Sequence, residues 1–233
     1  AFARLLPAVL ALAQRRVLDV VVVGGGDAAF ELALAFEWRL NGRGPERARV
    51  AWVTEGEAPL ASWPEAARHA GLRALAARRI TLFHEAAAEL RAGAVVLASG
   101  ARLACDVPVM ATGTEAPAWL AGSGLALDAC GAVQAGPTLQ SVSHPEVFAA
   151  GDGAVLAENL RRFAGGGTLL PVVEPARVTR LLWCGPGRAL GAWGGLVVSG
   201  RVAGWWLARA QRRMLAACAV PGAVPPGGAI RAA

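Results

Sequence analysis

The feature that most constrains the fold is a short strand pattern that leads into a glycine turn and then a helix pattern. Residues 17–23 read V-L-D-V-V-V-V, and such a β-branched run is typical of a parallel strand buried on both faces. Gly24-Gly25-Gly26 end the run, and apolar residues then recur at helical spacing from Asp27 to Leu40. This order predicts the start of an α/β domain with a parallel sheet.

The next part of the chain continues the alternation. The elements predicted there are a strand at 49–54, a helix at 66–79, a strand at 80–83, an antiparallel pair at 94–98 and 101–105, and a strand at 107–111. Beyond Thr112-Gly113 the chain becomes rich in Gly, Ala and Pro. The elements predicted in that remainder are a strand at 147–150, a helix at 154–163, short strands within 177–200 and a helix at 202–217.

Composition excludes several classes of protein. Hydrophobic residues make up 55% of the chain and charged residues 17%, which is typical of a globular protein with a buried core and not of a disordered chain. The net charge is +6, but the 23 basic residues are all Arg and are scattered along the chain, some of them as doublets, so no cationic face for nucleic acid is predicted. No uninterrupted apolar run reaches the roughly 18 residues that span a membrane.

The cysteines and histidines do not indicate a metal site. Cys105, Cys130, Cys184 and Cys218 are widely separated, so neither a metal-ligand pair nor a redox CxxC is present in the sequence. The three histidines also lack metal-ligand spacing. No residue pattern in the sequence identifies a catalytic group, so the sequence leaves the catalytic residues unknown.

The main candidate site is the G-x-G-x-x-A motif that starts at Gly24, with a strand before it and a helix after it. Gly24 permits a sharp turn, Gly26 permits a pyrophosphate to approach the backbone, and Ala29 is small enough for the helix to pack on the strand. The free N–H groups and the positive dipole end at the helix start would hold the anion, with Gly25 and Asp27 beside it. The alternative is a glycine turn with no ligand.

Glu55 is the candidate that would bind the adenosine ribose. It ends the second predicted strand, although it lies further from Gly24 than the usual interval of about 20 residues. An acidic residue there favours NADH over NADPH, because a 2′-phosphate would be repelled. Arg43, Arg47 or Arg49 would offset this repulsion, so the choice between the two nucleotides stays open.

Four segments resemble the FAD-dependent pyridine nucleotide-disulfide oxidoreductases, particularly the type II NADH dehydrogenase-like branch and the oxidoreductase associated with selenide, water dikinase. They are V-V-V-G-G-G-D-A-A-F-E-L-A at 21–33, C-D-V-P-V-M-A-T-G-T at 105–114, W-L-A-G-S-G-L-A-L-D at 119–128 and H-P-E-V-F-A-A-G-D at 144–152. The resemblance implies a Rossmann-like NAD(P)H-binding domain at 18–111. Parts of a split FAD-binding domain would lie at 1–17 and 112–165, and a small C-terminal α+β interface domain with a tail at 166–233.

The resemblance also assigns site residues. Glu31 would lie near the nicotinamide cofactor, Thr112 and Gly113 would lead back into the FAD domain, and Gly151 and Asp152 would hold FAD. The first glycine fingerprint of the family, which binds the ADP part of FAD, is expected upstream of Ala1. We therefore expect an N-terminally truncated chain whose FAD binding is weakened.

The expected function is transfer of hydride from NAD(P)H to FAD and of electrons to a quinone or another small-molecule acceptor. The alternative is a non-catalytic nucleotide-binding fragment or a degenerate paralogue. We expect a cytoplasmic protein that binds no nucleic acid. A peripheral contact with the inner face of the membrane through the helix at 202–217, where arginines flank an apolar surface, and a homodimer both stay open.

Overall fold

Strands and helices alternate along the first part of the chain, as a parallel sheet with crossover connections requires. The computed structural model describes residues 2–42, 44–56, 59–113, 115–149, 153–172 and 179–217. The elements before residue 112 are α1 (Phe2–Ala13), β1 (Leu18–Val23), α2 (Asp27–Asn41), β2 (Ala48–Val53), α3 (Glu65–Ala77), β3 (Thr81–Phe83), β4 (Ala87–Arg91), β5 (Ala94–Leu97), β6 (Arg102–Ala104) and β7 (Val107–Met110).

The later elements are η1 (Ala118–Gly122), α4 (Gly153–Ala164), β8 (Thr179–Gly185), β9 (Arg188–Trp193), β10 (Leu196–Gly200) and α5 (Arg201–Ala217). The chain divides into two compact units. The first unit consists of Ala1–Thr112 together with Arg177–Ala233, and the second unit is Gly113–Ala176. We describe each unit by itself.

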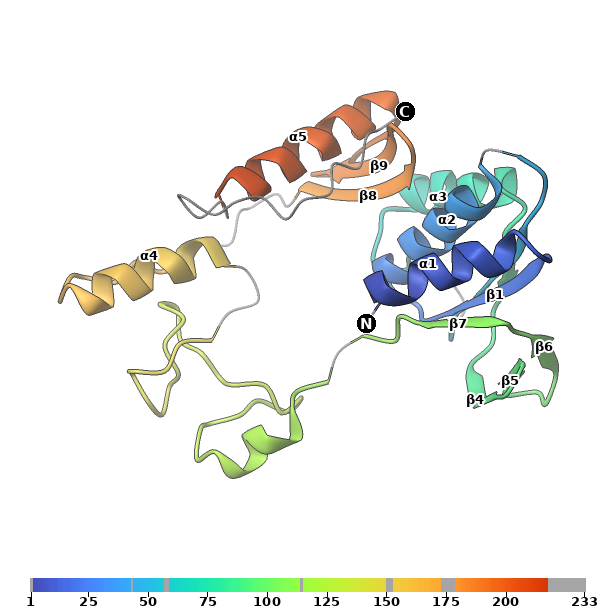
Figure 1. Ribbon diagram of the computed structural model, residues 1–233. Helices are drawn as coiled ribbons and strands as arrows, with labels where there is room; N and C mark the ends of the chain where they lie inside the picture. Colours follow the sequence, from blue (N-terminus) through green and yellow to red (C-terminus); the bar gives the residue numbers. More distant parts are fainter. Residues whose placement is uncertain are drawn as a thin grey trace. The chain divides into compact units, whose positions relative to one another are not determined.

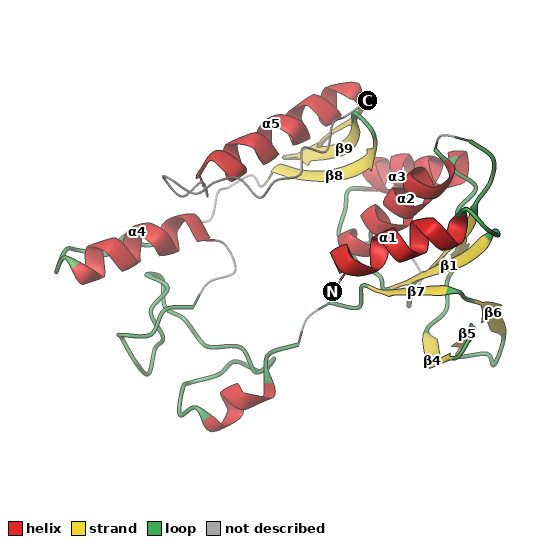
Figure 2. Cartoon of the chain, viewed as in Figure 1, coloured by secondary structure: helices red, strands yellow, loops and turns green. Residues whose placement is uncertain are grey.

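The predicted valine-rich strand lies inside the parallel sheet of the first unit. The sheet has the order β3-β2-β1-β7, and every pairing in it is parallel. The neighbouring strands β1 and β7 are labelled in Figure 2. Leu18 pairs with Ala48 on one side of β1, and Val20 pairs with Val107 on the other. The valines of β1 are at most 6% exposed, as expected for a strand that is covered on both faces.

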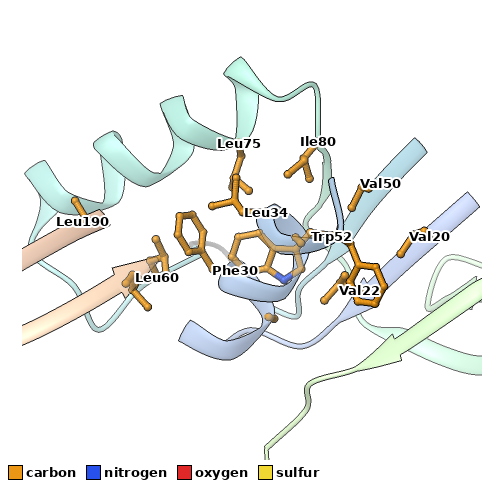
Figure 3. Packing of buried hydrophobic residues seen from close by; sticks show 14 of the residues in the cluster. Val20, Val22, Phe30, Leu34, Val50, Trp52, Leu60, Leu75, Ile80 and Leu190 are labelled. Atoms are coloured by element: carbon orange, nitrogen blue, oxygen red, sulfur yellow. The ribbon is translucent and has the colours of Figure 1, made fainter. Parts of the chain in front are cut away.

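The two faces of the sheet pack against different layers (Figure 1). Val20 and Val22 belong to the larger core, which they share with buried residues of α2 and α3 (Figure 3). Val21 and Val23 belong to a smaller core with Val95 and other residues of the antiparallel sheet β4-β5-β6. Successive side chains of a strand point to opposite faces, so β1 contributes to both cores.

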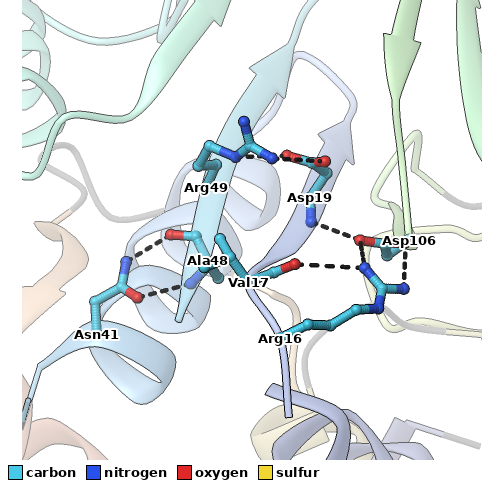
Figure 4. A network of polar contacts seen from close by, with 7 residues as sticks. All are labelled: Arg16, Val17, Asp19, Asn41, Ala48, Arg49 and Asp106. Atoms are coloured by element: carbon cyan, nitrogen blue, oxygen red, sulfur yellow. Dashed lines mark hydrogen bonds and ion pairs between the residues drawn. The ribbon is translucent and has the colours of Figure 1, made fainter. Parts of the chain in front are cut away.

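Polar contacts join β1, β2 and β7 near the start of β1 (Figure 4). The Arg16 guanidinium forms two hydrogen bonds of 2.7 Å with the two carboxylate oxygens of Asp106. Asp106 also accepts the backbone N–H of Asp19 at 2.9 Å, and Asp19 pairs with Arg49 at 3.0 Å. The hydrogen bond from Arg16, followed by that from the Asp19 N–H, lowers the pKa of Asp106 to about 2.

The C-terminal part of the first unit is an antiparallel sheet followed by a helix. The sheet has the order β10-β9-β8, and α5 follows it. Leu182, Leu190 and Ala192 of this sheet are buried in the same core as α2 and α3, and Figure 3 shows Leu190 there. The C-terminal sheet therefore packs on the helices that cover the parallel sheet. Among the described residues, no helix is both long and apolar enough to cross a membrane.

The second unit contains η1, α4 and loops joined by isolated β-bridges. Asn159 of α4 has no exposed surface. Its side-chain amide donates to the carbonyl oxygens of Thr138 (2.9 Å) and Leu170 (2.8 Å), and its side-chain oxygen accepts the Leu170 N–H at 2.8 Å. A single polar side chain thus connects the helix with two loops.

Most of the predicted elements are confirmed, within a few residues at their ends. These are the four parallel strands, the helices at 27–40, 66–79, 154–163 and 202–217, and the antiparallel strands at 94–98, 101–105 and within 177–200. The structure adds α1, β4 and η1, which are not predicted. The α/β fold class with additional antiparallel sheets is confirmed.

The prediction of a strand at 147–150 is wrong for residues 147–149, and Ala150 lies outside the described residues. Phe148 forms one isolated bridge with Gln140. The Val147 N–H donates to His144 O in a turn, and the Phe148 ring packs edge-on against Phe163 of α4 at 5.3 Å. A short apolar run predicts burial, but a strand also needs a partner of matching length.

Candidate functional site

Gly24 lies where the carboxyl ends of three strands meet. Its φ of 142° is unfavourable for residues with a side chain. Any Cβ there would overlap the Ala111 carbonyl oxygen just beyond β7. The Gly24 carbonyl accepts the buried Trp52 indole N–H of β2 at 2.6 Å, and its N–H donates to Val53 O at 2.9 Å. The tight turn expected at this glycine is therefore fixed by close packing.

Gly26 has the opposite surroundings. It is exposed, and a Cβ at this position would meet nothing within 4 Å. It is the N-cap of α2 and provides no side-chain capping hydrogen bond. Its carbonyl accepts the N–H groups of Ala29 and Phe30. The N–H groups of Asp27 and Ala28 come before the first helical hydrogen bonds, so the start of α2 is open to an anion.

Three of the predicted segments lie at the same edge of the parallel sheet. The glycine turn, Glu55 and Thr112 follow β1, β2 and β7 respectively. Chain connections from β1 diverge here, because β2 lies on one side of it and β7 on the other. Crevices at such a switch point are where open α/β sheets bind ligands. Glu55 and Thr112 are exposed, and Ala29 is fully buried between α2 and the sheet.

Asp27, the first residue of α2, is held by residues that the sequence analysis missed. One carboxylate oxygen accepts the Trp63 indole N–H at 2.7 Å, and the other pairs with the Arg180 guanidinium at 2.8 Å. Arg180 also donates to the Ser62 carbonyl at 2.7 Å and to the Ser62 hydroxyl at 3.0 Å. Its guanidinium lies 4.2 Å from the centre of the Trp63 ring. We call Asp27, Ser62, Trp63 and Arg180 the Asp27 cluster.

Glu31 lies one helical turn beyond Asp27 on α2 and faces the C-terminal sheet. Its carboxylate accepts the backbone N–H of Trp183 on β8 at 2.6 Å. Burial raises the pKa of Glu31, while the Trp183 hydrogen bond lowers it and the nearby Asp27 raises it. Glu31 thus anchors β8 to α2 near the Asp27 cluster.

The remaining predicted site residues lie elsewhere or outside the description. Gly113 begins the second unit and has a φ of 95°. Gly151 and Asp152 lie outside the described residues. Within the described part of the chain, no three His, Cys, Asp or Glu residues are grouped so that they could hold a metal ion.

Of the described thiols, Cys184 lies on β8, whereas Cys105 and Cys130 lie in separate connections between elements. Cys105 is buried and Cys130 is exposed. Burial raises the pKa of Cys105. Burial, followed by the charge of Glu31, raises the pKa of Cys184 to about 11. Both thiols therefore stay protonated at neutral pH, and a protonated thiol is a poor nucleophile.

A family model described as pyridine nucleotide-disulphide oxidoreductase matches residues 3–175. Among solved structures, LpdA from Mycobacterium tuberculosis is 19% identical with a TM-score of 0.60, and the match covers 76% of this chain and 40% of that chain. An FAD-dependent pyridine nucleotide-disulphide oxidoreductase from Desulfovibrio vulgaris is 17% identical with a TM-score of 0.59, and the match covers 81% of this chain and 53% of that chain.

The HOCl-induced flavoprotein disulfide reductase RclA from Escherichia coli is also 17% identical with a TM-score of 0.59, and the match covers 76% of this chain and 42% of that chain. The matched part of this chain thus corresponds to about half or less of each of these solved chains. At these identities the likeness shows the fold. No curated protein sequence matches this chain significantly.

Proposed function

Because the chain belongs to the pyridine nucleotide-disulphide oxidoreductase family, whose members use NAD(P)H and FAD, we propose that it binds a pyridine nucleotide at the glycine turn. Residues 18–111 would be the nucleotide-binding domain of a flavin-dependent oxidoreductase. When bound, the nicotinamide ring supplies hydride-transfer chemistry. The role of the protein would be to hold the nucleotide and orient it.

The contrast between Gly24 and Gly26 carries this proposal. Gly24 is enclosed by Ala111, whereas the space in front of Gly26 is empty and is bordered by the free N–H groups of the helix start. A side chain at residue 26 would fill that space. This is the arrangement that a pyrophosphate needs if it is to approach the backbone closely.

Glu55 supports a preference for NADH. It is exposed after β2, where a carboxylate would accept hydrogen bonds from the ribose and repel a 2′-phosphate. Of the arginines that would offset this repulsion, Arg47 precedes β2, at the opposite end of the strand from Glu55. Arg49 is paired with Asp19 at 3.0 Å, and Arg43 lies outside the described residues. We therefore expect NADH to bind more tightly than NADPH.

The FAD-binding role would belong to residues 1–17 and 112–165, with Thr112, Gly113, Gly151 and Asp152 toward the flavin. Residues 166–233 would form the interface domain and tail. For the electron acceptor we favour a quinone or another small molecule over a protein disulfide, as in the type II NADH dehydrogenase-like branch. The raised thiol pKa values of Cys105 and Cys184 support this choice.

α5 is the part of the chain that would contact a membrane surface. Its exposed apolar side chains include Val202, Trp205 and Leu215, and arginines lie between them in the sequence. Sedimentation with vesicles tests this contact. Binding to anionic vesicles, weakened by added salt, would support it, and equal recovery in the supernatant with and without vesicles would contradict it.

Calorimetry on the full chain tests the proposed function. We expect heat on titration with NADH for the wild type and for G44V, since Gly44 is equally open but lies away from the turn. We expect G26V to weaken NADH binding at least tenfold without lowering the melting temperature. A wild-type chain with no NADH heat would contradict the proposal. NADH heat without FAD heat or a flavin spectrum would favour the non-catalytic nucleotide-binding alternative.

A further inference from the structure

We propose that Arg180 is a positioning residue of the nucleotide site, which neutralises Asp27 so that the pyrophosphate of NAD(P)H can bind at the glycine turn. This inference rests on the proposed function. Arg180 lies on β8, beyond the last residue matched by the family model. It is 153 residues from Asp27 in the sequence, yet their side chains are 2.8 Å apart.

The electrostatic reason lies in the position of Asp27. A carboxylate in the first turn of a helix interacts favourably with the positive end of the helix dipole. A pyrophosphate bound at Gly26 would use the same end of α2, so the two anions would repel each other across a short distance. Pairing with Arg180 cancels the charge of Asp27. The helix start then remains available to the ligand.

The guanidinium is held firmly enough to act in this way. Besides Asp27, it contacts the Ser62 carbonyl, the Ser62 hydroxyl and the face of the Trp63 ring. Ser62 and Trp63 lie between β2 and α3. The Trp63 indole N–H fixes the second oxygen of Asp27. Arg180 therefore connects β8, the loop after β2 and the start of α2, all within the first unit.

A second set of contacts also holds β8 against α2 and does not include the side chain of Asp27. The Trp183 N–H donates to Glu31 at 2.6 Å, and Trp183 packs edge-on against Trp38 of α2 at 6.2 Å between ring centres. These contacts keep β8 on α2 when the side chain of residue 180 changes. The loss of the Arg180 charge is thus separable from the loss of the interface.

A double-mutant cycle on the full chain tests the inference. NADH affinity is measured by calorimetry for the wild type, R180Q, D27N and the double variant, and the melting temperature is recorded for each. We expect R180Q to weaken NADH binding about fivefold, which corresponds to one unneutralised charge near the phosphates in a largely solvated site. D27N leaves the Arg180 charge unpaired and should bind NADH more tightly than the wild type. The double variant carries neither charge and should bind within about twofold of the wild type.

R180K and R188Q complete the design. R180K keeps the charge and should retain most of the affinity. Arg188, at the start of β9, is exposed and forms no ion pair with another described residue, so R188Q is the matched control for loss of a cation. If R180Q unfolds, the double variant and R180K, each compared with the wild type, still decide the question, because both keep the pair without net charge.

The outcomes separate the two proposals. If the wild type binds no NADH, the proposed function fails and this inference fails with it. If the wild type binds NADH and R180Q binds it equally well, only the role of Arg180 is overturned. A double variant that binds NADH as weakly as R180Q would also overturn it, because that result indicates damage to the interface and not an unneutralised charge on Asp27.

Discussion

The two compact units are stabilised by different kinds of interaction. The first unit buries valines on both faces of β1 and large side chains such as Trp52 and Phe30 in one apolar core. Among the described residues of the second unit, the buried set is small and includes the polar residues Asn159 and Ser141. An apolar core can hold an exposed turn rigidly, whereas a unit held by polar contacts depends on each of them.

Two asparagines make the comparison specific. Asn41, at the end of α2, donates to Ala48 O and accepts the N–H groups of Arg47 and Ala48, all at 2.8–2.9 Å. Asn159 also forms three hydrogen bonds in the second unit, of which it donates two and accepts one. Asn41 lies beside a large apolar core and is partly exposed, but Asn159 is fully buried. The same chemistry should therefore contribute differently to stability in the two units.

The largest effect is expected from G24A, which places a methyl group against the Ala111 carbonyl in a backbone conformation that suits glycine. We expect a loss of about 3 kcal/mol or more in the free energy of unfolding. Denaturant unfolding followed by tryptophan fluorescence measures it. G26A is the matched control and should cost less than about 1 kcal/mol, since its Cβ meets no atom. Equal losses in the two variants would show that the turn is not locked at Gly24.

N159A should have the next largest effect and should be confined to the second unit. It leaves the Leu170 amide and two carbonyl groups without their partner. We expect a local loss of about 2–3 kcal/mol, measured as faster hydrogen exchange at Leu170. N41A should cost about 1 kcal/mol, because water can replace a partly exposed amide. A larger loss in N41A than in N159A would reverse the comparison.

W52F should have an intermediate effect on the first unit. It removes the indole N–H that donates to the Gly24 carbonyl. Because Gly24 is buried, that carbonyl would be left without a partner. We expect a loss of about 1–2 kcal/mol in global stability, seen as a lower midpoint in denaturant. Hydrogen exchange in the second unit should stay unchanged. If W52F instead speeds exchange at Leu170, the two units unfold together.

The smallest effect is the acid dependence of the Arg16–Asp106 contact (Figure 4). The pKa of Asp106 is lowered to about 2 in the folded protein, below the ordinary value of about 3.9. Its contribution is therefore fully present above pH 4 and is lost as the pH falls through 2. Solvent screens this pair, because the Arg16 side chain is 51% exposed. The stability difference between wild type and D106N should shrink from pH 4 to pH 2, and a constant difference would contradict this.

The parallel sheet could be predicted because its signals are local. A run of valines, three glycines and a helical spacing occupy adjacent residues, and β1, Gly24 and α2 follow directly from them. The Asp27 cluster could not be predicted in the same way. Arg180 lies far from Asp27 in the sequence, and a hydrogen bond between distant residues leaves no pattern along the chain.

The incorrect strand at 147–150 has a related cause. Apolar residues there pack against α4 through Phe148 and Phe163, and periodicity alone does not distinguish burial against a helix from pairing in a sheet. α1 lacked a clear signal because Pro7 lies inside it and proline usually interrupts helices. Sequence patterns thus located the turn, and only the fold identified the residues that surround it.

The valine run of β1 has one more consequence. Because residues 20–23 are all valine, sliding the strand by one position would still present valine to both layers, so hydrophobicity alone cannot set its alignment with β2 and β7. Gly24 settles that alignment, since the slot beside Ala111 admits no side chain. With the start of β1 kept in register, a residue inserted within the strand would push Val23 into that slot. The glycine therefore acts as a stop that determines how far β1 extends into the sheet.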